Sequence, residues 1–225
     1  MNRSLFLRLK DPVSALTHFA AFLAAALAAA PLLLHAAGKG ADLPGLWSLA
    51  VFMLSMMLLY AASTAYHSFR LSAKGEKRLK RLDHMMIFVL IAGSYTPICV
   101  TALGKTGVWM LWLVWGIAAA GMALKFFFVG CPKWVSSVLY IGMGWVCILV
   151  LPKIYHALSP AGFIPLLIGG IFYTVGGVIY ALKLTRFNHL IPGFGNHELF
   201  HVFVMLGSTC HYITMYAGLP FSPGH

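Results

Sequence analysis

The sequence predicts an all-α membrane protein built as a single bundle of seven transmembrane helices. Of its 225 residues, 60% are apolar and only 9% are charged, and the mean hydropathy is +0.86. Soluble domains of similar length carry about 25% charged residues. The bilayer is therefore the solvent that this chain is suited to, and its length fits one compact domain.

Seven stretches have the ~20 apolar residues that a helix needs to cross the hydrocarbon layer. They cover residues 15–37, 46–68, 84–103, 107–128, 134–155, 161–183 and 197–218. The first is longer than the ~7–15-residue apolar core of a signal peptide, so we expect it to remain as a span. Pro97 interrupts the third, and helices in membrane bundles tolerate such a kink. Residues 1–14 and 219–225 flank this helical domain as short terminal segments.

Basic residues predict the orientation. The N-terminal segment and the connections after the second, fourth and sixth spans lie on one side of the membrane. Together they hold 13 of the 16 Lys and Arg residues. These are Arg3, Arg8, Lys10, Arg70, Lys74, Lys77, Arg78, Lys80, Arg81, Lys125, Lys133, Lys183 and Arg186. Only Lys39, Lys105 and Lys153 lie on the other side. By the positive-inside rule, we expect a cytoplasmic N-terminus and an extracytoplasmic C-terminus.

The net charge of +11 would suggest nucleic acid in a soluble protein. Here the basic residues lie between spans, where they set orientation and contact anionic headgroups. We therefore expect membrane lipids as partners and no nucleic acid.

Polar residues from distant parts of the chain meet at the predicted cytoplasmic end. Ser63 and His67 end the second span, Asp83 precedes the third, and His197 and His201 open the seventh. Because successive spans run in opposite directions, these residues share one leaflet. Ionisable groups at this depth are costly and need partners.

Their chemistry suits a metal. His197 and His201 are four residues apart, so they project from one helix face, and His67 would complete a set of three imidazoles. Three protein nitrogens plus water is the coordination typical of catalytic zinc, which lowers the pKa of its water toward ~7. Asp83 would accept a proton from that water or orient a ligand, and Ser63 would hydrogen-bond the water or a substrate carbonyl.

Other interpretations stay open for each residue alone. Histidines at a membrane boundary are often simply polar groups in the headgroup layer, and a bare HxxxH is a weak signal. Serines such as Ser63 pack at helix contacts inside membranes. Asp83 would equally suit an ion pair with Arg81 or Lys80. The convergence of one acid and three histidines at one depth favours the metal site.

Glu198 lies between two predicted ligands in sequence but not on their face. It is ~100° from His197 and ~60° from His201 around the helix. We expect it to compensate charge at the helix N-terminus or to pair with a loop base such as Arg186.

The remaining histidines and the cysteines receive no chemical role. His18 is at the right depth if the first span turns it inward, and His84 is expected at the interface. His211 lies ~15 Å deeper on the seventh span, where packing is favoured. The four cysteines are Cys99, Cys131, Cys147 and Cys210; they form no CxxC pair.

The order and spacing of these motifs resemble a known family. Ser63-x-x-x-His67, Asp83 and His197-x-x-x-His201 across seven spans, with Asp11-Pro-Val-Ser-Ala-Leu-Thr-His18 at the start, are similar to bacterial hemolysin III-related proteins. These form a branch of the progestin and adipoQ receptor (PAQR) family, within a superfamily of ceramidase-like membrane hydrolases. The resemblance covers nearly the whole chain.

The resemblance implies zinc held by His67, His197 and His201, with Ser63 and Asp83 close to the metal. It also implies a multi-pass protein of the bacterial cytoplasmic (inner) membrane with a role in lipid homeostasis. The expected activity is zinc-dependent hydrolysis of a lipid amide or ester that enters from the bilayer. The alternatives are a non-enzymatic sensor with structural zinc and a channel or pore-forming protein.

Overall fold

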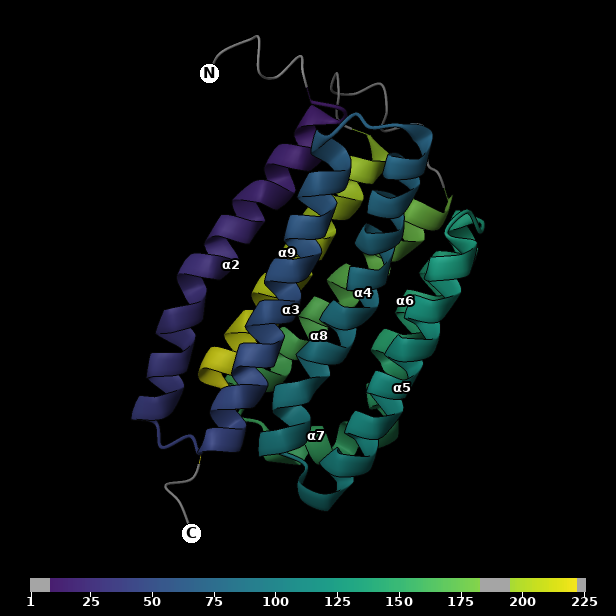
Figure 1. Ribbon diagram of the computed structural model, residues 1–225. Coiled ribbons are helices and arrows are strands. Elements are labelled where there is room, and N and C mark those ends of the chain that lie inside the picture. The colour runs from purple at the N-terminus through teal and green to yellow at the C-terminus, as the bar shows by residue number, and fades with distance from the viewer. Residues whose placement is uncertain (1–8, 183–194, 222–225) are drawn as a thin grey trace.

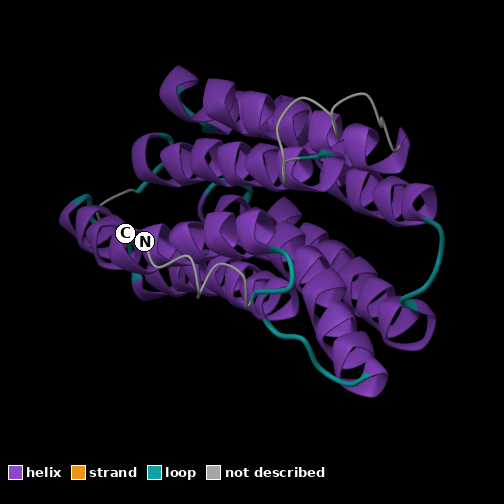
Figure 2. Ribbon diagram, turned by 90° about the horizontal axis from the view of Figure 1, so that it is seen from above, coloured by secondary structure: helices purple, strands orange, loops and turns teal. Residues whose placement is uncertain are grey.

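The computed structural model describes residues 9–182 and 195–221 of the chain (Figure 1). All regular structure within these ranges is helical (Figure 2). The predicted all-α fold is therefore confirmed. Arg3, Arg8, Lys183 and Arg186 lie outside the described residues, as do parts of the predicted terminal segments.

Seven long helical rods make up the described chain. They are α2 (Pro12–Gly38), α3 (Leu43–Ser68), α4 (Ala73–Thr101), α5 (Gly104–Phe128), the broken rod α6 (Lys133–Gly144), η1 (Trp145–Val150) and α7 (Leu151–Ala157), then α8 (Pro160–Leu182) and α9 (Asn196–Ala217). Six of them are long and apolar enough to cross a membrane. The seventh predicted span is α9, which carries His197, Glu198 and His201 in its first two turns and is correspondingly more polar.

The fifth rod is broken by a side chain from another helix. Tyr95 of α4 donates its hydroxyl hydrogen to the Gly144 carbonyl at 2.6 Å and accepts a hydrogen bond from Cys147 N at 2.8 Å. A hydroxyl inserted into the backbone ladder is a recognised cause of helix breaks. Pro152 lacks an amide hydrogen and restarts the helix in its first turn, where none is needed.

Helix α4, the third rod, starts earlier than the hydropathy predicts. It begins at Ala73 rather than near residue 84, because Ser72 caps it by accepting a hydrogen bond from Gly75 N at 3.4 Å. Charged turns of α4 thus extend beyond the apolar span. They carry Lys74, Lys77, Arg78, Lys80 and Arg81.

The helices form a ring that the first and last rods close. Helix α3 packs between α2 and α4, α5 packs on α4, and α6 packs on α8. Helix α9 contacts both α8 and α2, so the two ends of the chain's helical part meet (Figure 1). Glycines permit the close α8–α9 contact, since a Cβ at Gly169 would lie 2.5 Å from His211 Cδ2.

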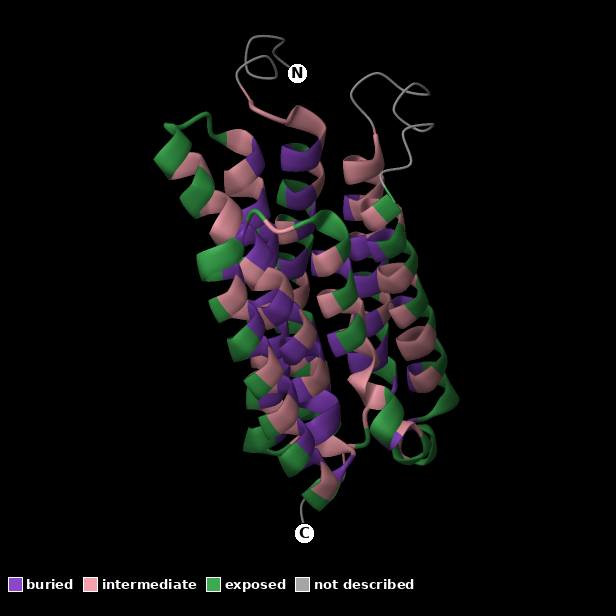
Figure 3. Ribbon diagram, turned by 90° about the vertical axis from the view of Figure 1, so that its right-hand side faces the viewer, coloured by how far each residue is buried: buried purple, intermediate pink, exposed green. Residues whose placement is uncertain are grey.

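The outer surface of the bundle is apolar, as a lipid-facing surface must be. Buried residues line the inside of the ring, whereas exposed positions follow its outer faces (Figure 3). Leu27, Leu34 and Trp112 are 77%, 73% and 79% exposed. Such extensive apolar exposure indicates contact with lipid rather than water.

Helices α2, α4, α6 and α9 begin at one end of the bundle, which we call the site end. Most described basic residues gather at this end, whereas Lys39, Lys105 and Lys153 lie at the other. That separation agrees with the charge pattern used above. The cytoplasmic location of the site end stays a prediction.

Candidate metal centre

Three histidines from two helices converge at the site end. His67 lies in the last turn of α3, and His197 and His201 occupy successive turns at the start of α9. One ligating atom from each lies within 4.8 Å of the others. The structure therefore brings together all three predicted ligands.

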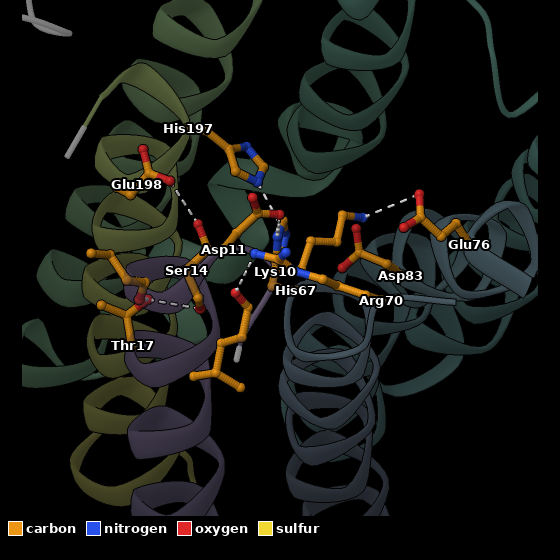
Figure 4. A network of polar contacts seen from close by, with 12 residues as sticks. Lys10, Asp11, Ser14, Thr17, His67, Arg70, Glu76, Asp83, His197 and Glu198 are labelled. Atoms are coloured by element: carbon orange, nitrogen blue, oxygen red, sulfur yellow. Dashed lines mark hydrogen bonds and ion pairs between the residues drawn. The ribbon is translucent and has the colours of Figure 1, made fainter. Parts of the chain in front are cut away.

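The spacing of the ring nitrogens suits a tetrahedral ion. Nε2 of His67 and Nε2 of His197 are 3.1 Å apart (Figure 4). Two nitrogens bound to zinc at ~2.0–2.1 Å in tetrahedral geometry would be separated by about 3.3 Å. One pair of ring nitrogens thus already has a spacing close to that of a zinc site, and the ligating atom of His201 lies within 4.8 Å of both.

Asp11 orients the first ligand. Its Oδ2 lies 2.9 Å from Nδ1 of His67, and its backbone N donates to the His67 carbonyl at 2.9 Å. A carboxylate that accepts the Nδ1 hydrogen leaves Nε2 as a lone-pair donor, and Nε2 is the nitrogen that faces His197. Carboxylate–histidine pairs of this kind accompany many zinc sites.

Sequence reasoning missed Asp11. The residue stands immediately before Pro12, at the start of the first helix, and is 56 positions from His67. The signal that could have pointed to Asp11 is the scarcity of acidic residues, because the chain contains only five of them.

The role of Asp11 predicts a weaker metal site in Asp11→Asn. An amide oxygen accepts the Nδ1 hydrogen less strongly than a carboxylate, and loss of such an outer partner typically weakens zinc binding by about 10–100-fold. Competition against a zinc chelator measures the change. Glu76→Gln, which removes an acid paired with Lys10 at the same end, is the control and should keep full affinity. Equal affinities in wild type and Asp11→Asn would contradict this role.

Asp83 and Ser63 lie on the wall of the same cavity as His197 and His201. Both are buried. Asp83 Oδ2 contacts His84 Nδ1 at 3.2 Å, and among the described residues it forms no ion pair with Arg81 or Lys80. Nor does a hydrogen bond between described residues join Asp83 or Ser63 to the triad.

The cavity runs from this cluster into the bundle. Its volume is about 150 Å³. Beyond the polar end it is lined mainly by apolar side chains of α4, α6, η1, α7 and α8, reaching Val150 and Ile154 toward the opposite end. Such a lining suits an alkyl chain better than an ion or water.

Two neighbouring histidines are more buried than a boundary position implies. His18 is 3% exposed and stacks on His201 with ring centroids 3.7 Å apart, so α2 does turn it inward. The expectation of an interfacial His84 is wrong, because that side chain is buried and lines the cavity. Because α4 begins at Ala73, His84 lies within the helix, on the face that points into the bundle.

Glu198 and His211 have structural contacts. Glu198 accepts hydrogen bonds from Gly195 N and from Ser14 Oγ, each at 2.8 Å. Its predicted place at the helix N-terminus is confirmed, and the Ser14 contact joins α9 to α2 (Figure 4). His211 is buried and packs edge-on against Tyr173 at 5.2 Å.

Comparison with known proteins identifies the family of this chain. A family model described as "Haemolysin-III related" matches residues 6–212, almost the whole chain. The chain belongs to the haemolysin III-related family. This membership confirms the resemblance stated from the motifs.

Named relatives of the haemolysin III-related chain come from bacteria and animals. It is 37% identical over 203 residues to the Hemolysin-3 homolog of Bacillus subtilis (strain 168), covering 88% of this chain and 89% of the relative. It is 36% identical over 200 residues to Hemolysin-3 of Bacillus cereus, covering 88% and 87%. The human Monocyte to macrophage differentiation factor is 28% identical over 181 residues, covering 77% and 71%.

Proposed function

We propose that this protein is a zinc-dependent hydrolase that cleaves an amide or ester bond of a membrane lipid and so contributes to membrane-lipid homeostasis. The observation that carries the proposal is a three-histidine cluster of which His197 and His201, together with Asp83 and Ser63, line a largely apolar cavity. A site of this composition combines hydrolytic groups with space for an alkyl chain.

Zinc held by His67, His197 and His201 would supply Lewis acidity, which activates water and polarises a carbonyl. Asp83 accepts the proton of the attacking water and passes it to the leaving group. Ser63 donates a hydrogen bond to the carbonyl oxygen as negative charge develops there. The apolar lining holds the lipid chain, which enters sideways from the bilayer, and excludes water from it.

The proposed setting is the bacterial cytoplasmic membrane, with the site end facing the cytoplasm. The basic residues around α4 support this orientation. They would also attract anionic lipid headgroups toward the site end.

A product screen tests the proposal. Purified protein loaded with zinc is incubated with a total lipid extract, and mass spectrometry looks for released fatty acid, alcohol or amine. Chelator-treated protein is the control. Products that form only with zinc support hydrolysis, whereas identical lipid profiles in both samples count against it.

A structural role for zinc is the second candidate. It is favoured by the absence, among the described residues, of a hydrogen bond between Asp83 and the triad, and by the way Asp11, α3 and α9 meet at the ligands. Under this reading the protein is a sensor or regulator clamped by the metal. A pore is less well supported, because the inner lining is mostly apolar.

A further inference from the structure

Lys125 is a buried cation without an acidic partner. It lies in the last turn of α5 and is 0% exposed. All five acidic residues of the chain are described, and none forms an ion pair with it. An uncompensated buried ammonium group is costly, so a negative charge is expected nearby.

The side chains around Lys125 include one that can supply this charge. Its Nζ lies 3.0 Å from Sγ of Cys131 and also contacts Oγ of Ser136. Cys131 Sγ and Ser136 Oγ are 3.5 Å apart, so the three groups form a closed cluster. The Tyr140 ring is further away, at 5.7 Å. Of these groups, only the thiol ionises readily near neutral pH.

Cys131 sits in the connection between α5 and α6, outside the spans, and is partly exposed. Burial acts to raise the pKa of its thiol, but the hydrogen bonds to Lys125 and Ser136 and the lysine charge outweigh this and lower the pKa below its usual value. A thiolate that solvent can reach is the reactive form of cysteine.

We propose that Cys131, Lys125 and Ser136 form a thiolate site that hydrogen peroxide oxidises. The thiolate sulfur attacks one oxygen of the peroxide, the O–O bond breaks, and an S–O bond forms. Sulfur is oxidised to sulfenic acid while the peroxide is reduced. The departing hydroxide takes a proton from solvent at the partly exposed sulfur, giving water, and the Lys125 ammonium stays beside the sulfur throughout.

This site is separate from the metal centre and independent of the proposed hydrolysis. Its three residues lie on α5, α6 and the segment between them, whereas the triad lies on α3 and α9.

Alkylation measures the thiolate directly. Full-length protein in detergent is treated with iodoacetamide between pH 5.5 and 9.5, and mass spectrometry follows the rate at Cys131. We expect a midpoint below the ordinary thiol value of about 8.5, and a rate at pH 7 about tenfold higher than in Lys125→Met. Lys133→Met is the control. Lys133 lies two residues from Cys131 and its Nζ lies over the Tyr180 ring, so removing its charge should leave the rate of alkylation unchanged. A wild-type midpoint at or above the ordinary value would overturn the proposal.

The pH dependence of Cys131 alkylation in the wild-type protein tests the proposal even if a variant folds poorly. Cys99 is buried and should stay unmodified in every sample, so its reaction identifies an unfolded variant. In that case Ser136→Ala, which removes one hydrogen-bonding partner of the lysine, replaces Lys125→Met and should also slow alkylation.

A second measurement tests the oxidation. After brief exposure to hydrogen peroxide, dimedone should label Cys131 as a sulfenic acid. A thiol reductant added after the peroxide and before the dimedone should prevent the label. Cys131→Ser should remove it, and Lys125→Met should reduce it about tenfold, in proportion to the thiolate fraction. No label on wild-type Cys131 would overturn the assignment.

Discussion

His67→Ala should reduce bound zinc from about one ion per chain to less than about a tenth of that amount, because two imidazoles hold zinc far more weakly than three. His67 also carries the Asp11 hydrogen bond, so its removal eliminates a ligand and the contact that orients it. Elemental analysis of protein purified in detergent without chelator measures the effect.

His156→Ala is the matched control. His156 lies in α7 at the opposite end of the bundle and is exposed, so its loss should leave zinc content unchanged. Full zinc occupancy in His67→Ala would refute the ligand assignment. Loss of zinc in both variants would indicate general unfolding rather than loss of a ligand.

Asp83→Asn should lower lipid hydrolysis by at least about 100-fold while zinc content stays at the wild-type level. The amide has nearly the same shape as the carboxylate but cannot accept the proton of the attacking water, and proton transfer by a positioned side chain typically contributes about 10²–10⁴-fold. Product formation and zinc content are measured on the same preparation.

Asp42→Asn makes the same chemical change away from the site. Asp42 caps α3 at the other end of the bundle by accepting a hydrogen bond from Gly45 N at 2.8 Å, and asparagine is an equally good cap. This control should retain activity. Unchanged turnover in Asp83→Asn would remove the proposed proton transfer and favour zinc as a structural clamp.

The fold and the triad were accessible from the sequence because both depend on local signals. Long apolar runs specify the rods, and the four-residue spacing of His197 and His201 places both on one helix face. Alternating span direction then brings His67 to the same end. These inferences need no knowledge of how the helices rotate against each other.

The missed features all depend on contacts between distant segments. Asp11 reaches His67 because the chain before α2 runs beside the end of α3, where Lys10 N and Asp11 N donate to the carbonyls of Ser68 and His67 at 3.4 and 2.9 Å. The break in the fifth rod requires Tyr95 of α4. No pattern within one of these segments alone specifies the contact that it makes with the other.

The closed ring has a consequence for synthesis. The three histidines come from the second and the last of the long rods, and Asp11 and Ser14 lie at the start of the first, so this cluster of side chains is complete only after the final rod has been inserted. A metal held by the three histidines would then stabilise the chain only once α9 has been inserted. A nascent chain interrupted before α9 would lack two of the three histidines, so a bound metal would indicate that the chain has been translated and inserted as far as α9.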